Sequence, residues 1–205
     1  MNRRHFLTTS ATAGLALAAG CATSSPLPYG GIIDTHTHFY DPARPEGVPW
    51  PPKDDAVLSR TILPTEFAAL TAPLGVTGTV VVEASPWVED NQWVLDLAET
   101  NPVILGVVGN LKPGTPEFAG HLKRFAKNRR FRGIRMGNDS LQAALKPGAA
   151  QEDLRRLADL NLSLDLLISP QNLSDAAQLG ESLRTLRIIV DHCANVPVNG
   201  VCGFN

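Results

Sequence analysis

The chain alternates apolar, strand-like runs with amphipathic, helix-like stretches from residue 30 onward. The six predicted strands cover residues 31–34, 77–83, 103–108, 131–135, 163–168 and 187–191. The predicted helices cover residues 64–72, 89–100, 115–128, 151–160 and 172–183. This alternation is typical of repeated βα units on a parallel sheet, and continuous apolar runs indicate strands buried on both faces. The fold class is therefore predicted to be α/β.

Six βα units fit either an open, doubly wound sheet or most of a (β/α)8 barrel. The glycine signature G-x-G-x-x-G of dinucleotide-binding open sheets does not follow the first predicted strand. Polar residues instead follow several strands at their carboxyl ends, where barrels place their active sites. We therefore predict a (β/α)8, TIM-barrel-like fold of which about six of the eight βα units are present.

Residues 1–21 have the pattern of an export signal. Arg3 and Arg4 precede Phe6, Leu7 and an uncharged run, which resembles a twin-arginine signal for proteins that are exported in the folded state. The sequence from residue 18 to Cys21 resembles a bacterial lipobox, in which the cysteine becomes the lipidated first residue of the mature chain. The alternative is soluble release after cleavage.

These features predict three parts: the signal over residues 1–21, a tether over residues 22–29, and an incomplete barrel domain over residues 30–205. The mature protein is expected outside the cytoplasm, either periplasmic or anchored to the cell-envelope membrane through Cys21. A formal net charge of −2 with no basic run argues against a nucleic-acid partner. The expected partner is a small-molecule substrate, and the oligomeric state is left open.

Two histidines one residue apart follow the apolar run of the first predicted strand. Side chains alternate along a strand, so Asp34, His36 and His38 share one face and both imidazoles can converge on one atom. Two buried imidazoles lose hydration, and a divalent metal or a substrate oxygen held between them compensates that cost. The spacing therefore predicts an enzyme site. A polar strand end without a ligand is the alternative.

Three further candidate site residues follow later strands. His192 follows the sixth strand, with a simple turn position as its alternative. Arg135 would reach the barrel mouth and bind a carboxylate or lactone oxygen, whereas Arg132 is expected to face the opposite way toward a surface acid. Glu83 would bind substrate hydroxyls or orient a histidine. Structural ion pairs are the alternatives for Arg135 and Glu83.

The long segment over residues 41–63 breaks the βα rhythm. It carries five prolines and Trp50 and shows no periodicity. A loop of this length directly after the histidine strand is better placed to cover a site than to join two elements. A plain surface connection is the alternative.

Five motifs occur in the order seen in amidohydrolase-related proteins: Ile33 to His38, Gly78 to Pro86, Gly106 to Gly109, Phe131 to Arg135, and Val190 to His192. Over residues 30 to about 199 the chain resembles the lactonase-type, predicted metal-dependent hydrolases of the amidohydrolase 2 group. That group includes sugar-lactone and pyrone-dicarboxylate lactonases. The resemblance implies a distorted (β/α)8 barrel that opens lactones or hydrolyses related esters and amides.

The resemblance also implies roles for individual residues. The family's first-strand histidines match His36 and His38, and its later strand-end histidine matches His192. These three would be catalytic and would hold a divalent metal, with zinc the expected ion, although some relatives work without a metal. A metal-dependent decarboxylase of the same superfamily is the alternative function.

The family's remaining acid, an aspartate at the end of the eighth strand, has no counterpart in these 205 residues. The sequence is therefore expected to be a truncated or frameshifted gene product or a partial gene model. A chain that completes its barrel by association is the other interpretation. An inactive barrel that serves as a binding module is the third functional hypothesis.

Overall fold

The computed structural model describes residues 30–199, so the predicted signal, the tether and Cys21 lie outside the described residues. One sheet holds the strands in the order β1-β2-β3-β4-β5-β6, and the pairs from β2 to β6 are parallel. The strands are β1 (Ile32–Thr37), β2 (Val76–Val82), β3 (Ile104–Gly109), β4 (Phe131–Gly137), β5 (Ser163–Leu167) and β6 (Arg187–Val190). All six coincide with predicted runs, and the α/β class is confirmed.

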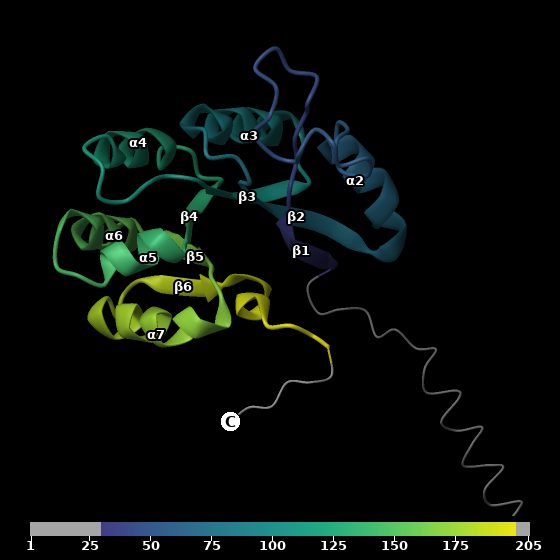
Figure 1. Ribbon diagram of the computed structural model, residues 1–205. Coiled ribbons are helices and arrows are strands. Elements are labelled where there is room, and N and C mark those ends of the chain that lie inside the picture. Colours follow the sequence, from purple (N-terminus) through teal and green to yellow (C-terminus); the bar gives the residue numbers. More distant parts are fainter. Residues whose placement is uncertain (1–29, 200–205) are drawn as a thin grey trace, which may run out of the picture. The chain divides into compact units, whose positions relative to one another are not determined.

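Helices connect the strands and lie along the outer side of the curved sheet (Figure 1). They are α2 (Pro64–Thr71), α3 (Val88–Thr100), α4 (Phe118–Phe125), α5 (Asn138–Ala144), α6 (Ala149–Asp159) and α7 (Leu173–Ser182). Short 3-10 turns are η1 (Ala72–Leu74), η2 (Pro170–Asn172) and η3 (Asp191–Asn195). Helix α5 was not predicted, because its opening Asn, Asp and Ser favour turns as readily as helices. Among the described helices, none is long and apolar enough to cross a membrane.

The hydrophobic core lies between the helices and the outer face of the sheet. Phe118, Leu122 and Phe125 follow a helical spacing along α4 and are all buried. Ile104 of β3 and Ile134 of β4 belong to the same cluster. Full burial of each such side chain stabilises the fold by about 1.5–3 kcal/mol. The helices therefore cover one face of the sheet and leave the concave face free to line a cavity.

The two outer strands of the sheet, β1 and β6, are exposed at hydrophobic positions. Ile33 of β1 is 51% exposed and Ile189 of β6 is 47% exposed. An edge strand has a neighbour on one side only, so its side chains have fewer contacts. The expectation that the apolar runs are buried on both faces is therefore wrong for β1 and β6, neither of which has a buried residue, although it holds for most of the inner strands β3 and β5.

A bulge in β4 changes the direction of one arginine. The pairing of β3 with β4 shifts register between Val107 and Val108, and the partners step from Phe131 to Gly133. Arg132 is the extra residue, and such an insertion interrupts the alternation of faces. Arg132 consequently lines the central cavity. The expectation that it faces away from the site is wrong, because strand parity does not survive the bulge.

Candidate active site

An open cavity of about 620 Å³ lies against the concave face of the sheet. Its polar lining comes from β1, β4 and β5 and from both ends of β6, with Arg187 at the amino end of β6. The polar side chains that line it include His36, Arg132, Ser163, Asp165, Asp191 and His192. The cavity is large enough for a small ring-shaped molecule.

The structure brings the three predicted histidines together. The ring centre of His36 lies 5.1 Å from that of His38 and 4.5 Å from that of His192. His36 lies on β1 and His38 directly follows the strand, and their rings meet because alternate residues of an extended chain point to one face. His192 arrives from the turn after β6. That turn holds His192 at a positive φ of 51°, a left-handed conformation that costs energy in most residues.

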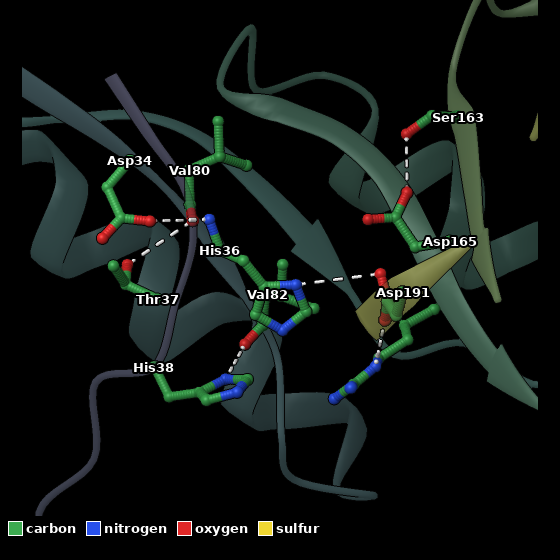
Figure 2. Close-up of polar contacts among 10 residues, drawn as sticks. Asp34, His36, Thr37, His38, Val80, Val82, Ser163, Asp165 and Asp191 are labelled. Atoms are coloured by element: carbon green, nitrogen blue, oxygen red, sulfur yellow. Dashed lines mark hydrogen bonds and ion pairs between the residues drawn. The ribbon is translucent and has the colours of Figure 1, made fainter. Parts of the chain in front are cut away.

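His38 has a fixed tautomer. Its Nδ1 lies 2.6 Å from the backbone carbonyl oxygen of Val82 (Figure 2). Because a carbonyl oxygen only accepts hydrogen bonds, Nδ1 donates its proton and Nε2 of the neutral ring keeps a free lone pair. Burial lowers the pKa of His38 and outweighs the opposing effect of the Val82 hydrogen bond. The ring is therefore neutral near pH 7, with Nε2 available as an acceptor or ligand.

Asp191 joins the site through two contacts. Its side chain is 2% exposed, and its Oδ1 lies 3.7 Å from Nδ1 of His36. Its Oδ2 accepts a hydrogen bond of 2.9 Å from Nε of Arg135. Burial lowers the pKa of His36 even though the Asp191 carboxylate acts to raise it. Sequence reasoning passed over Asp191, although its position at the end of β6, directly before His192, was the available signal.

Arg135 contacts the site through Asp191, but it is not among the residues that line the cavity, and its Nε already donates to Asp191. Its side chain is largely buried and forms an ion pair with Asp191. This contact matches the structural ion pair that was the alternative to substrate binding.

Asp165 is a second acid that sequence reasoning missed. It lies buried on β5 and lines the same cavity as His36. Its Oδ1 accepts a hydrogen bond of 3.2 Å from Oγ of Ser163. Burial, reinforced by the nearby Asp191 carboxylate, raises the pKa of Asp165 to about 6. The available signal was a pair of polar residues two positions apart within an otherwise apolar strand.

Glu83 lies outside the lining of the central cavity. It borders a separate small cavity beneath residues 41–63, together with Arg44, Trp50 and Asp90. Its Oε1 accepts a hydrogen bond of 2.6 Å from the backbone N–H of Ser85, and its buried Oε2 has no hydrogen-bond partner among the described residues. Burial raises the pKa of Glu83 to about 7.

Three residues form a group suited to a metal ion. His36, Asp191 and His192 each offer a donor atom, and these atoms lie within 4.8 Å of one another. Nε2 of His36 is buried and has no hydrogen-bond partner in the described part of the chain. Two imidazoles and a carboxylate suit zinc. The predicted ligand set was His36, His38 and His192, so Asp191 is an addition and His38 lies outside this group.

Comparison with curated proteins finds L-fucono-1,5-lactonase of Burkholderia ambifaria, which is 29% identical over 168 residues. The match covers 81% of this chain and 58% of the lactonase. The chain therefore spans less than two thirds of the length of that relative.

Two solved structures have similar folds. An amidohydrolase from Burkholderia multivorans with bound zinc superposes with a TM-score of 0.66 at 24% identity, over 79% of this chain and 57% of that protein. A probable 2-pyrone-4,6-dicarboxylic acid hydrolase from Acinetobacter baumannii with citric acid bound gives a TM-score of 0.62 at 23% identity, over 81% and 60% of the two chains. These likenesses confirm the partial TIM-barrel fold.

A family profile described as Amidohydrolase matches residues 33–202, which is most of the chain. The match begins at the histidine strand and includes every residue of the metal-ligand group described above. The chain therefore belongs to the Amidohydrolase family, as the order of its sequence motifs predicted.

Proposed function

We propose that this chain carries the site of a hydrolase that opens a lactone or a similar cyclic ester by attack of water. The observation that carries the proposal is the convergence of His36, Asp191 and His192 on one cavity of about 620 Å³. The similarity to a lactonase supports a cyclic ester as the substrate class.

We propose zinc as the cofactor, held by His36, Asp191 and His192. The unpartnered, buried Nε2 of His36 fits this assignment, and so does the zinc in the similar Burkholderia multivorans structure. When bound, zinc polarises a carbonyl and lowers the pKa of a coordinated water to about 7.

The remaining residues would orient the reactants and move protons. His38 presents the lone pair of Nε2 because Val82 holds its Nδ1 proton. Asp165 is the buried acid whose pKa, at about 6, lies close to neutrality, so it is suited to accept the proton that the attacking water releases. Arg135 fixes the orientation of Asp191 through their hydrogen bond.

The test is acid release from a panel of sugar lactones and pyrone dicarboxylates, followed with a pH indicator. We expect His36→Ala to lower kcat/KM by about 10²–10³-fold, because it removes both a ligand and a polar group of the site. His121→Ala is the matched control, since His121 lies on α4, outside the cavity lining. Chelation should also lower the rate, and added zinc should restore it.

The products separate the rival functions. A ring-opened hydroxy acid supports the proposal, whereas released carbon dioxide supports a decarboxylase. Full activity in His36→Ala would show that the proposed site is wrong. If the wild-type chain unfolds cooperatively but turns over no substrate and binds no zinc, the inactive-barrel hypothesis is favoured.

We also propose that the protein is exported and attached to the membrane through Cys21, on the pattern of residues 1–21 alone. We expect replacement of Arg3 and Arg4 together by lysine to keep the protein in the cytoplasm, because twin-arginine signals require the arginine pair. Cys21→Ser should move the exported protein from the membrane fraction to the soluble fraction. Cell fractionation and immunoblotting measure both. Unchanged distributions would contradict the proposal.

A further inference from the structure

We propose that Trp50 is the positioning residue of His38 and that Arg44 is the anchor that holds Trp50 in place. This inference deepens the proposed function and rests on it for the catalytic role of His38. We name residues 41–61, which carry Trp50 and Arg44, the strap.

The strap is closed at its base by backbone hydrogen bonds. The N–H of Tyr40 donates to the carbonyl oxygen of Ile62 at 3.0 Å, and the N–H of Ile62 donates to that of Tyr40 at 2.9 Å. Inside this bridge, Oγ1 of Thr61 donates to Oδ1 of Asp41 at 2.6 Å. Because its two ends meet, the strap is a closed surface loop that begins three residues after His38.

Arg44 fastens the strap to helix α3. Its Nη2 donates to Oδ1 of Asp90 at 2.9 Å and to the carbonyl oxygen of Gly47 at 3.0 Å. Its guanidinium carbon lies 4.5 Å from the ring centre of Trp93. Both partners of the Arg44–Asp90 ion pair are largely buried, so this contact is less screened by solvent than a surface pair.

The fastened strap brings Trp50 against His38. The two ring centres lie 5.3 Å apart in an edge-on arrangement, and Trp50 also packs 5.2 Å from the ring of Tyr40. His38 is thus contacted by Trp50, by the carbonyl of Val82 and by the ring of His36. A single hydrogen bond at Nδ1 orients the imidazole only while it is made, and the ring can rotate about its Cβ–Cγ bond whenever that contact opens. The packing of Trp50 restricts this rotation and fixes the direction of Nε2.

The first test compares Trp50→Ala and Trp50→Phe with the wild type. We expect Trp50→Ala to lower kcat by about 10–100-fold, the range seen when a group that orients a site residue is lost, with KM changed less than twofold. Trp50→Phe should restore most of kcat, because it keeps an aromatic ring against His38. Trp87→Ala is the control, since Trp87 is substantially exposed. Equal kcat in Trp50→Ala and the wild type would overturn the inference.

A second readout does not depend on activity. The Nδ1–H proton of His38 should give a slowly exchanging ¹⁵N-coupled NMR signal, assigned by its loss in His38→Gln. We expect this signal to broaden or disappear in Trp50→Ala and to persist in Trp50→Phe and Trp87→Ala. Its persistence in Trp50→Ala would overturn the inference. If the signal behaves as expected but no lactone is opened, the proposed function fails and the positioning role stands.

The anchor is tested with Arg44→Met. If Arg44 acts only by holding Trp50, this variant should show the same loss of the His38 signal as Trp50→Ala. The double variant Arg44→Met/Trp50→Ala should then lower kcat no more than Trp50→Ala alone, because both residues act through the contact between Trp50 and His38. Arg60→Met is the matched control, since Arg60 is a strap arginine in an exposed ion pair with Glu66. Additive losses would overturn the assignment of Arg44.

Discussion

We expect Asp191→Ala to lower the free energy of unfolding by about 3–5 kcal/mol. The Asp191 side chain is 2% exposed and its partner Arg135 is 12% exposed, so the substitution leaves a buried guanidinium group without its carboxylate. The desolvation cost of that charge is then uncompensated. Urea denaturation at pH 7.5, followed by circular dichroism, measures the change.

A double-mutant cycle isolates the contribution of the ion pair. Asp191→Ala with Arg135→Met removes both charges, and we expect this variant to recover most of the lost stability because no buried charge remains unpaired. The control is Glu152→Ala, which breaks the exposed ion pair with Arg155 and should cost less than about 1 kcal/mol. Additive effects at positions 191 and 135 would show that the pair does not couple.

The same carboxylate links stability to the proposed site. Asp191 contacts Arg135 through one oxygen and faces His36 through the other. The ion pair therefore fixes the direction in which Asp191 can serve as a ligand. The sequence predicted Arg135 as a substrate-binding residue. In the structure Arg135 lies on β4 and orients the carboxylate of Asp191, which follows β6.

The strands could be predicted from the sequence because their signal is local. Runs such as Val80-Val81-Val82 are rich in β-branched residues, and the turns between them carry the usual Gly and Pro signals. Strand parity also placed His36 and His38 on one face, and their rings do lie 5.1 Å apart. Regular alternation therefore predicted both the sheet and the first half of the candidate site.

The rest of the site depends on contacts between distant segments. Arg135 and Asp191 are 56 residues apart in sequence, and their partnership depends on how β4, β5 and β6 are aligned. The direction of Arg132 depends on a bulge in the pairing with β3, which parity within one strand cannot predict. Glu83 was placed correctly at the end of β2, but only the path of the strap determines which cavity it borders.

Glu83 provides the second large expected effect. Its side chain is buried under the strap, and the charge of the neighbouring Arg44 is already used by Asp90. Burial is the main reason that the pKa of Glu83 rises to about 7 from an ordinary value of 4.5, with the Asp90 carboxylate acting in the same direction. Between these two pH values the folded chain holds a proton that the unfolded chain releases.

Stability should therefore fall as the pH rises from 4.5 through 7, because deprotonation favours the unfolded state. The full penalty, present above pH 7, is about 3 kcal/mol. We expect Glu83→Gln, which keeps an oxygen for the N–H of Ser85, to be more stable than the wild type by up to this amount at pH 8 and nearly equal to it at pH 4.5. Urea denaturation at both pH values measures the difference.

Glu181→Gln, at an exposed position on α7, is the control and should change stability by less than about 0.5 kcal/mol at either pH. An equal effect of Glu83→Gln at pH 4.5 and pH 8 would show that Glu83 does not retain its proton in the folded chain.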